Sequence, residues 1–175
     1  MGDEASDAAF MMAELAEQAG FLAAHAVWSV SDGSVLVPFV GCALADGKNT
    51  LNRFVDEEHV ERAVERAKEQ LAANGEDALF ATLIYDAYAT LAEGKTDALV
   101  LESRVYSDPA IAMTMIVPYR NAGHPDGFAV YRPKFRGVSA PESPNYEVLT
   151  EAFFRGVDAH EKGAEVWNRH IDESR

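Results

Sequence analysis

The sequence predicts an α+β protein. Its predominantly antiparallel sheet combines N-terminal strands with a four-stranded meander, and it carries an N-terminal helix, a middle helix and a long C-terminal helix. Between residues 79 and 136, successive segments have hydrophobic residues at every second position, which predicts strands. Only short turns separate these segments, and short turns join antiparallel neighbours. Segments with helical spacing lie before the N-terminal strands, between those strands and the meander, and after the meander. The 175 residues, 48% of them hydrophobic, suit a single domain covering 1–175.

The first helix is expected over residues 6–24, where apolar side chains recur at the spacing of one helix face. A side-chain oxygen of Ser6 or of Asp7 is able to accept a hydrogen bond from a free backbone N–H, as N-cap residues do. Gly20 lies inside this segment and costs about 1 kcal/mol relative to alanine. The pattern therefore does not determine where the helix ends.

Residues 25–54 change to a period of two, which predicts short strands joined by two hairpin turns. Residues 31–34 and 46–48 are the expected turns, because each contains a glycine that can adopt the positive φ of a tight turn. Pro38 lacks a backbone N–H, so we expect its strand to lie at an edge of the sheet or to carry a bulge.

Two further helices are predicted. The middle one starts at the acidic residues 56–58, has a narrow apolar stripe typical of a surface helix, and ends with Gly75 at the position that favours glycine. The last one runs from 145 to about 171, after a linker rich in proline and serine. Its continuous apolar face includes His160 and Trp167, and we expect this face to dock on the sheet or on a second subunit.

The meander strands are expected at residues 79–91, 98–106, 111–120 and 128–135. Alternation along them predicts one apolar face and one face that collects acidic, basic, tyrosine and threonine side chains. Keeping Asp86 and Glu102 on the same face requires an odd number of loop residues between the first two strands. We therefore expect a bulge at Gly94, and Asp86 close to Glu102 or Arg104.

This polar face is the expected functional surface, because tyrosine and arginine are enriched at binding hot spots. The residues expected to bind a ligand or partner are Asp86, Tyr88, Glu102, Arg104, Tyr106, Arg120, Arg132 and His160. A carboxylate pair such as Asp86 and Glu102 also suits acid–base chemistry, although no catalytic residue is assigned. The plain alternative is a solvated sheet surface with cross-strand charge pairs, each contributing roughly 0.2–1 kcal/mol.

The formal net charge of −14 argues against nucleic acid or an anionic membrane surface as a partner. No lysine or arginine precedes Lys48, which indicates either a solubilising acidic surface or a basic protein partner. The acidic N-terminus is unlike a signal peptide, no apolar run is long enough to span a bilayer, and Cys42 is the single cysteine. These features predict a cytoplasmic location.

No cofactor and no metal are expected. The glycine–lysine pairs at 47–48 and 94–95 lack the spacing and the following helix of a phosphate-binding loop. The five histidines show no metal-ligand spacing.

Two classes of function remain. The first is a non-enzymatic protein-binding or adaptor module that forms a homodimer or binds another protein. The second is a small-molecule binder or enzyme with a pocket between the polar sheet face and the C-terminal helix. A deep cleft with perturbed pKa values favours the second class, and a flat solvated face favours the first.

Overall fold

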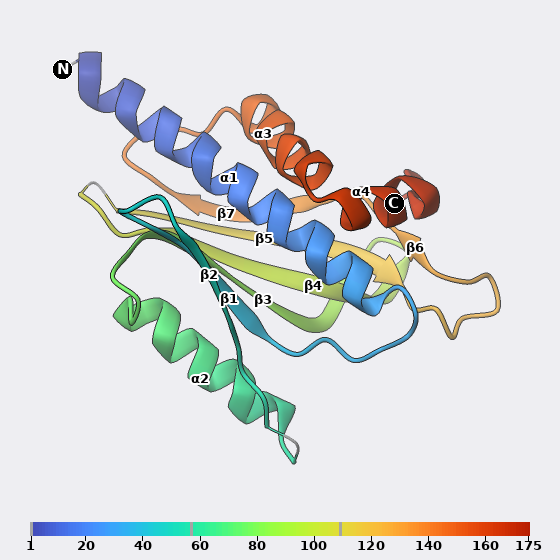
Figure 1. Cartoon of the computed structure of the whole chain (residues 1–175). Coiled ribbons are helices and arrows are strands. Elements are labelled where there is room, and N and C mark those ends of the chain that lie inside the picture. Colours follow the sequence, from blue (N-terminus) through green and yellow to red (C-terminus); the bar gives the residue numbers. More distant parts are fainter. Residues whose placement is uncertain (1, 57, 109) are drawn as a thin grey trace.

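A twisted antiparallel sheet with helices on both faces forms the computed structural model of this chain (Figure 1). The structure describes residues 2–56, 58–108 and 110–175, with side chains from residue 7 onward. Within these residues the helices are α1 (Gly2–Val30), α2 (Val60–Ala73), α3 (Tyr146–Ala159) and α4 (Glu161–His170). The strands are β1 (Phe39–Leu44), β2 (Asn49–Arg53), β3 (Ala78–Leu91), β4 (Gly94–Val105), β5 (Ile111–Arg120), β6 (Ala129–Val130) and β7 (Lys134–Ser139).

The sheet has the strand order β2-β1-β3-β4-β5, and both β6 and β7 pair with the far side of β5. All of these pairings are antiparallel, so the predicted α+β class is confirmed. Pro133 separates β6 from β7, where a single strand over 128–135 was expected. Proline cannot donate a ladder hydrogen bond, which explains the interruption.

Helix α1 lies on one face of the sheet, and α3 and α4 run alongside it (Figure 1). Helix α2 covers the β1 and β3 region of the opposite face. Its Leu71 belongs there to a small core with Cys42 of β1 and Leu83 of β3. The larger core lies beneath α1 and contains Leu15, Ile84 and other buried side chains from three helices and the central strands. Both faces of the sheet are therefore partly covered.

The hairpin expected between residues 25 and 37 is wrong, because α1 continues to Val30. The run from Val27 to Val30 fits a strand and a helix equally well, since short apolar runs do not distinguish the two periods. Packing decides for the helix: Ala26, Val27 and Val30 are buried against the sheet. Gly33, the glycine of the expected turn, instead follows the end of α1. Its φ is 90°, and its N–H donates to the carbonyl of Val30.

The second predicted hairpin is confirmed: β1 and β2 flank a turn in which Gly47 has φ 84°. Pro38 lies just before β1, which is an inner strand, so the expected edge position is wrong. The Pro38 carbonyl still accepts a hydrogen bond from the Phe54 N–H at 2.9 Å, which does not require an N–H on the proline. The middle helix is also confirmed as α2. Its left-handed terminal residue is Asn74, at φ 50°, and not the glycine that follows.

The predicted register of the first meander hairpin is wrong. Leu91 pairs with Gly94 across a two-residue loop, and no register shift marks a bulge at Gly94. This register pairs Asp86 with Leu99, and Glu102 with Leu83. Residues directly opposite each other share a face, so Asp86 points to the α1 face while Glu102 and Arg104 point to the α2 face. The prediction assumed one buried face, whereas helices cover parts of both.

The last helix is divided at His160, which ends α3 and caps the start of α4. Its apolar face packs mainly against α1 and only marginally against the sheet. Gly20 of α1 and Gly156 of α3 lie at this crossing. A Cβ at Gly20 would overlap the carbonyl oxygen of Phe153, and one at Gly156 would overlap that of Glu17. The glycine that weakens α1 in isolation thus permits close contact between the helix backbones.

Candidate functional site

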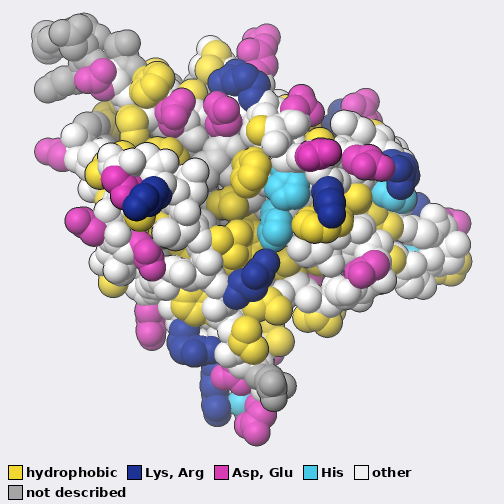
Figure 2. All heavy atoms as spheres, viewed as in Figure 1, with side chains coloured by type: hydrophobic (Ala, Val, Ile, Leu, Met, Phe, Trp, Pro, Cys, Tyr) yellow, Lys and Arg dark blue, Asp and Glu magenta, His cyan; other side chains and the backbone are white. Residues whose placement is uncertain are grey.

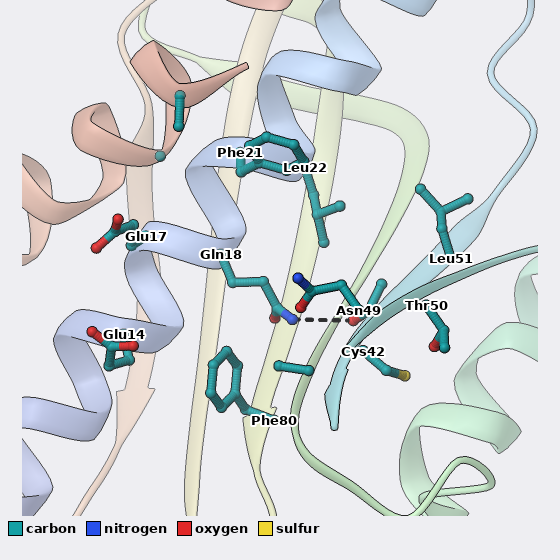
Figure 3. A pocket seen from close by; sticks show the side chains of 14 residues that line it. Glu14, Glu17, Gln18, Phe21, Leu22, Cys42, Asn49, Thr50, Leu51 and Phe80 are labelled. Carbon is teal, nitrogen blue, oxygen red and sulfur yellow. Dashed lines mark hydrogen bonds between the residues drawn. The ribbon is translucent and has the colours of Figure 1, made fainter. Parts of the chain in front are cut away.

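A groove of about 430 Å³ lies between α1 and the β1–β2 hairpin (Figure 3). It exists because α1 crosses above β3 and β4 and leaves the β1–β2 edge of that face uncovered. The side chains that line it include Glu14, Glu17, Gln18, Phe21 and Leu22 of α1, Ala43, Asn49 and Leu51 of the hairpin, Phe80 of β3 and Ala159 of α3.

Small residues on β1 form the floor of the groove. Gly41 lies opposite Leu51, and Ala43 lies opposite Asn49, so these four residues share the face that looks toward α1. A Cβ at Gly41 would come within 2.5 Å of a methyl group of Leu22. The alternating side chain of Cys42 points the other way, into the core beneath α2, and burial raises the pKa of its thiol. Cys42 is thus a small buried residue whose thiol the groove does not use.

Gln18 anchors α1 above the floor. Its Nε2 donates to the carbonyl of Gly41 at 3.4 Å (Figure 3). Its Oε1 accepts from Thr82 Oγ1 at 2.9 Å. Ser103 Oγ lies 2.8 Å from the same Thr82 oxygen. Because the only hydroxyl proton of Thr82 goes to Gln18, Ser103 must donate to Thr82. The side chains of Thr82 and Ser103 are both buried, so this network fixes the height of α1 above the sheet.

Glu14 and Asn49 are the polar lining groups still available to a ligand. Within the described part of the chain, neither side chain has a hydrogen-bond or ion-pair partner. Glu17 differs, since its Oε2 lies 3.7 Å from Nε of Arg155. The groove therefore combines an apolar body with a hydrogen-bond-accepting carboxylate and an amide.

A hydrogen-bonded histidine pair borders the groove. His25 Nδ1 lies 3.1 Å from His160 Nε2, and the His160 ring packs 5.0 Å from the ring of Phe21, a lining residue. Gly163 N–H donates to His160 Nδ1 at 2.9 Å, as the N-cap contact of α4. Phe39 and Trp28 pack edge-on against His25, with ring centroids 5.6 and 5.8 Å away. Figure 2 shows histidine side chains gathered beside hydrophobic ones on this surface.

These contacts assign the protons of both imidazoles. Because His160 Nδ1 accepts from Gly163, its proton sits on Nε2, which donates to His25 Nδ1; the His25 proton is therefore on Nε2. A metal on His160 Nε2 would force a proton onto Nδ1, against the Gly163 N–H. The pair is thus built as a neutral hydrogen-bonded chain and not as a metal ligand set. Across the described residues no cluster of three or more potential ligands forms either.

Burial lowers the pKa of His25 and of His160 below the ordinary value of 6.5. The neighbouring His160 and the guanidinium of Arg53 lower the pKa of His25 further. Lys162 adds another positive charge close by, with its Nζ 5.1 Å from the centre of the Trp28 ring. Apolar burial and nearby cations thus keep the pair neutral at pH 7.

We expect His160→Asn to weaken the dependence of stability on pH. As pH falls below about 6.5, the unfolded chain binds protons before the buried imidazoles do, so the wild type loses stability on acidification. Asparagine removes one titrating group of the pair but remains a good N-cap. Urea unfolding should give similar free energies at about pH 8, and a smaller loss for His160→Asn toward about pH 5. Equal losses in the two proteins would contradict the assignment.

The residues predicted on one polar face are divided among four places. Tyr88 and Arg120 line a second hollow at the far end of the sheet. Asp86 lies near them, and each of its two carboxylate oxygens lies 2.9 Å from the Tyr119 hydroxyl, which donates to them. Burial raises the pKa of Asp86, although the Tyr119 hydrogen bond opposes this. His160 lies instead beside the groove, hydrogen-bonded to His25 of α1, and not in a pocket with the residues of the polar sheet face.

The remaining predicted residues lie apart from both hollows. Glu102 is 3.8 Å from Lys68 of α2, and Tyr106 donates its hydroxyl to the Leu71 carbonyl, while burial raises the Tyr106 pKa to about 12. Arg104 is exposed on this same face. Arg132 lies 3.8 Å from Glu173 at an exposed site. Asp86 and Glu102 do not form the acid–base pair considered above, because the sheet lies between them.

Sequence reasoning missed the residues of the groove, Phe21 and Leu51 above all. Both are large hydrophobic side chains left more than a third exposed, at 41% and 37%. The only signal along the chain was the small pair Gly41 and Ala43 on one face of a strand, which indicates close approach or empty space. That signal does not say which helix lies above.

None of the helices in the described part of the chain combines the length and hydrophobicity that crossing a bilayer requires. No model of a protein family, no curated protein and no solved structure matches this chain.

Proposed function

We propose that this protein binds a small, mainly apolar molecule in the groove between α1 and the β1–β2 hairpin. The observation that carries the proposal is the cavity itself. Its volume of about 430 Å³ lies within the roughly 300–1,000 Å³ of small-molecule sites, which are lined mostly by apolar side chains with a few polar groups. Phe21, Leu22, Leu51 and Phe80 provide such a lining.

The polar groups indicate which ligand suits the groove. Glu14 and Asn49 offer a carboxylate and an amide without partners among the described residues, so a hydrogen-bond donor or a positive charge at one end of the ligand is favoured. The side chain of Gln18 already forms hydrogen bonds with Gly41 and Thr82, so it holds α1 in place above the floor of the groove. The proposed ligand therefore has an apolar body and carries hydrogen-bond donors that Glu14 or Asn49 can bind.

Filling the groove tests this function. We expect Nile red, a neutral apolar dye, to become fluorescent on binding the wild type, and Ala43→Trp to weaken its binding at least about tenfold, equivalent to about 1.4 kcal/mol. Ala43 is only partly buried, so a larger side chain there occupies the groove with little effect on the core. Val35→Lys is the control, because Val35 is 75% exposed and does not line the groove. Unchanged dye binding by Ala43→Trp would rule out the groove.

A protein-binding or adaptor role is the second candidate, supported by a different observation. Large hydrophobic side chains are exposed along the C-terminal half of α1, the following loop and β2: Phe21, Trp28, Val35, Val37 and Leu51. Such a patch is typical of interaction surfaces, and a second copy of the chain is the simplest partner. The Val35→Lys control separates the two candidates, since it should dissociate a dimer in light scattering yet leave dye binding intact.

A further inference from the structure

A second hollow, of about 390 Å³, lies at the end of the sheet remote from the β1–β2 edge. Residues of β3, β4 and β5 meet there with segments next to β6 and the last residue of the chain. Tyr88 pairs with Asp97, and Asp97 pairs with Tyr119, so these three side chains stand side by side across three strands. They form the base of the hollow.

Within this base Tyr119 is held in place, and Asp97 carries a negative charge. The Tyr119 hydroxyl donates to both oxygens of Asp86, 2.9 Å away, and burial raises the pKa of Tyr119 well above its usual range. Tyr119 thus stays protonated and in place. Asp97 beside it has no hydrogen-bond or ion-pair partner among the described side chains. Burial raises the pKa of this carboxylate too.

Basic side chains stand on the other walls. Lys95 Nζ lies 4.3 Å from the centre of the Tyr88 ring, and the Arg175 guanidinium lies 4.9 Å from the centre of the Tyr131 ring. Neither forms an ion pair with a carboxylate in the residues that the structure describes. Arg120 is held by the carbonyls of Gly127 and Asp126, at 2.7 and 3.0 Å, and adds a fixed positive charge.

Unpaired charges of both signs meet in this hollow. With 29 acidic and 15 basic residues, carboxylates are in excess, yet Lys95 and Arg175 are placed over aromatic rings and face the same hollow as an unpaired carboxylate. Within the described residues, Asp97 forms no ion pair with Lys95 or Arg175. A ligand that carries both charges, separated by a few bonds, satisfies the two walls at once.

We propose that this hollow binds a small zwitterion of the α-amino-acid class with an aromatic side chain. Its ammonium group lies against Asp97, and its carboxylate lies between Lys95 and Arg175. The exposed ring of Tyr88 faces the aromatic side chain, whereas the buried ring of Tyr131 supports Arg175 from beneath. Ring–ring contact with Tyr88 contributes beyond simple burial. This site is independent of the groove, which lies at the opposite edge of the sheet.

Three related probes test the proposal by calorimetry on the full chain at neutral pH. L-Phenylalanine carries both charges, 3-phenylpropionate lacks the ammonium group, and 2-phenylethylamine lacks the carboxylate. We expect L-phenylalanine to bind at least about tenfold more tightly than either. Equal binding of 3-phenylpropionate would reduce the hollow to an anion site and overturn the proposal, as would the absence of L-phenylalanine binding.

Variants then assign each charge. Asp97→Asn should remove the preference for L-phenylalanine over 3-phenylpropionate, and Lys95→Met combined with Arg175→Met should remove its preference over 2-phenylethylamine. Glu93→Gln is the matched control, an exposed carboxylate in the β3–β4 turn that does not line the hollow. Thermal unfolding identifies any variant that fails to fold. If a folded Asp97→Asn protein keeps the full preference, Asp97 is not the ammonium site and the proposal fails. Ala43→Trp, which fills the groove, should leave L-phenylalanine binding unchanged.

Discussion

Replacing Gly156 by alanine is expected to lower the free energy of unfolding by about 3 kcal/mol. Its new Cβ would overlap the Glu17 carbonyl oxygen and come within 2.7 Å of the Phe21 nitrogen. Both atoms belong to the α1 backbone, which cannot rotate away as a side chain does. Helices α1 and α3 must therefore separate, and the core between them loses contacts. In an ordinary helix interior the same change stabilises by about 1 kcal/mol, so its sign is diagnostic.

Urea unfolding measures this effect, with two companion variants. Gly20→Ala tests the crossing from the other helix, because its Cβ would overlap the Phe153 carbonyl, and a loss of similar size is expected. Gly137→Ala is the control, since a Cβ there meets nothing within 4 Å and its φ is not in the left-handed region. A Gly156→Ala protein as stable as the wild type would contradict the close crossing of α1 and α3.

The second large effect is expected at Trp167 of α4. Its side chain is 1% exposed and packs edge-on against Phe153 and Phe154, with ring centroids 5.9 Å away in each case. Trp167→Ala removes the largest buried side chain and leaves a cavity next to α1, which should cost about 3–5 kcal/mol. If Trp167→Ala shows no cooperative unfolding transition at 37 °C, the predicted loss of stability is also confirmed.

Trp167→Phe should cost much less, about 1 kcal/mol. The indole Nε1 is buried and has no hydrogen-bond partner within the described residues. Removing this unsatisfied donor offsets part of the lost packing. Urea unfolding of the two variants side by side measures the difference. Equal losses for alanine and phenylalanine would show that the indole N–H is satisfied in solution.

Sequence patterns predicted several elements closely and failed where packing decides. The strand 111–120 and the turn at Gly47 are found where expected, because strand alternation and positive φ are local properties. The faces of the meander were assigned wrongly. Changing the loop from three residues to two shifts the register by one residue, which moves every side chain of the strand to the opposite face of the sheet. Asp86 and Glu102 therefore came to lie on opposite faces.

The candidate site shows the same division. His25 and His160 are 135 positions apart and meet only because α3 ends beside α1. The groove depends on where α1 crosses the sheet, which Gln18 and the glycines at the α1–α3 crossing decide together. No periodicity along the chain encodes such a distance.

The sequence by itself determined the α+β class, the antiparallel meander, the middle helix and the acidic charge balance, because each depends on neighbours in the chain or on composition. Only the tertiary structure decided how far α1 extends, which face Asp86 occupies, and where the groove and the charged hollow form. The physical reason is that burial, helix crossing and pairing of charges depend on residues far apart in sequence, whose free energies are settled only when the whole fold is packed.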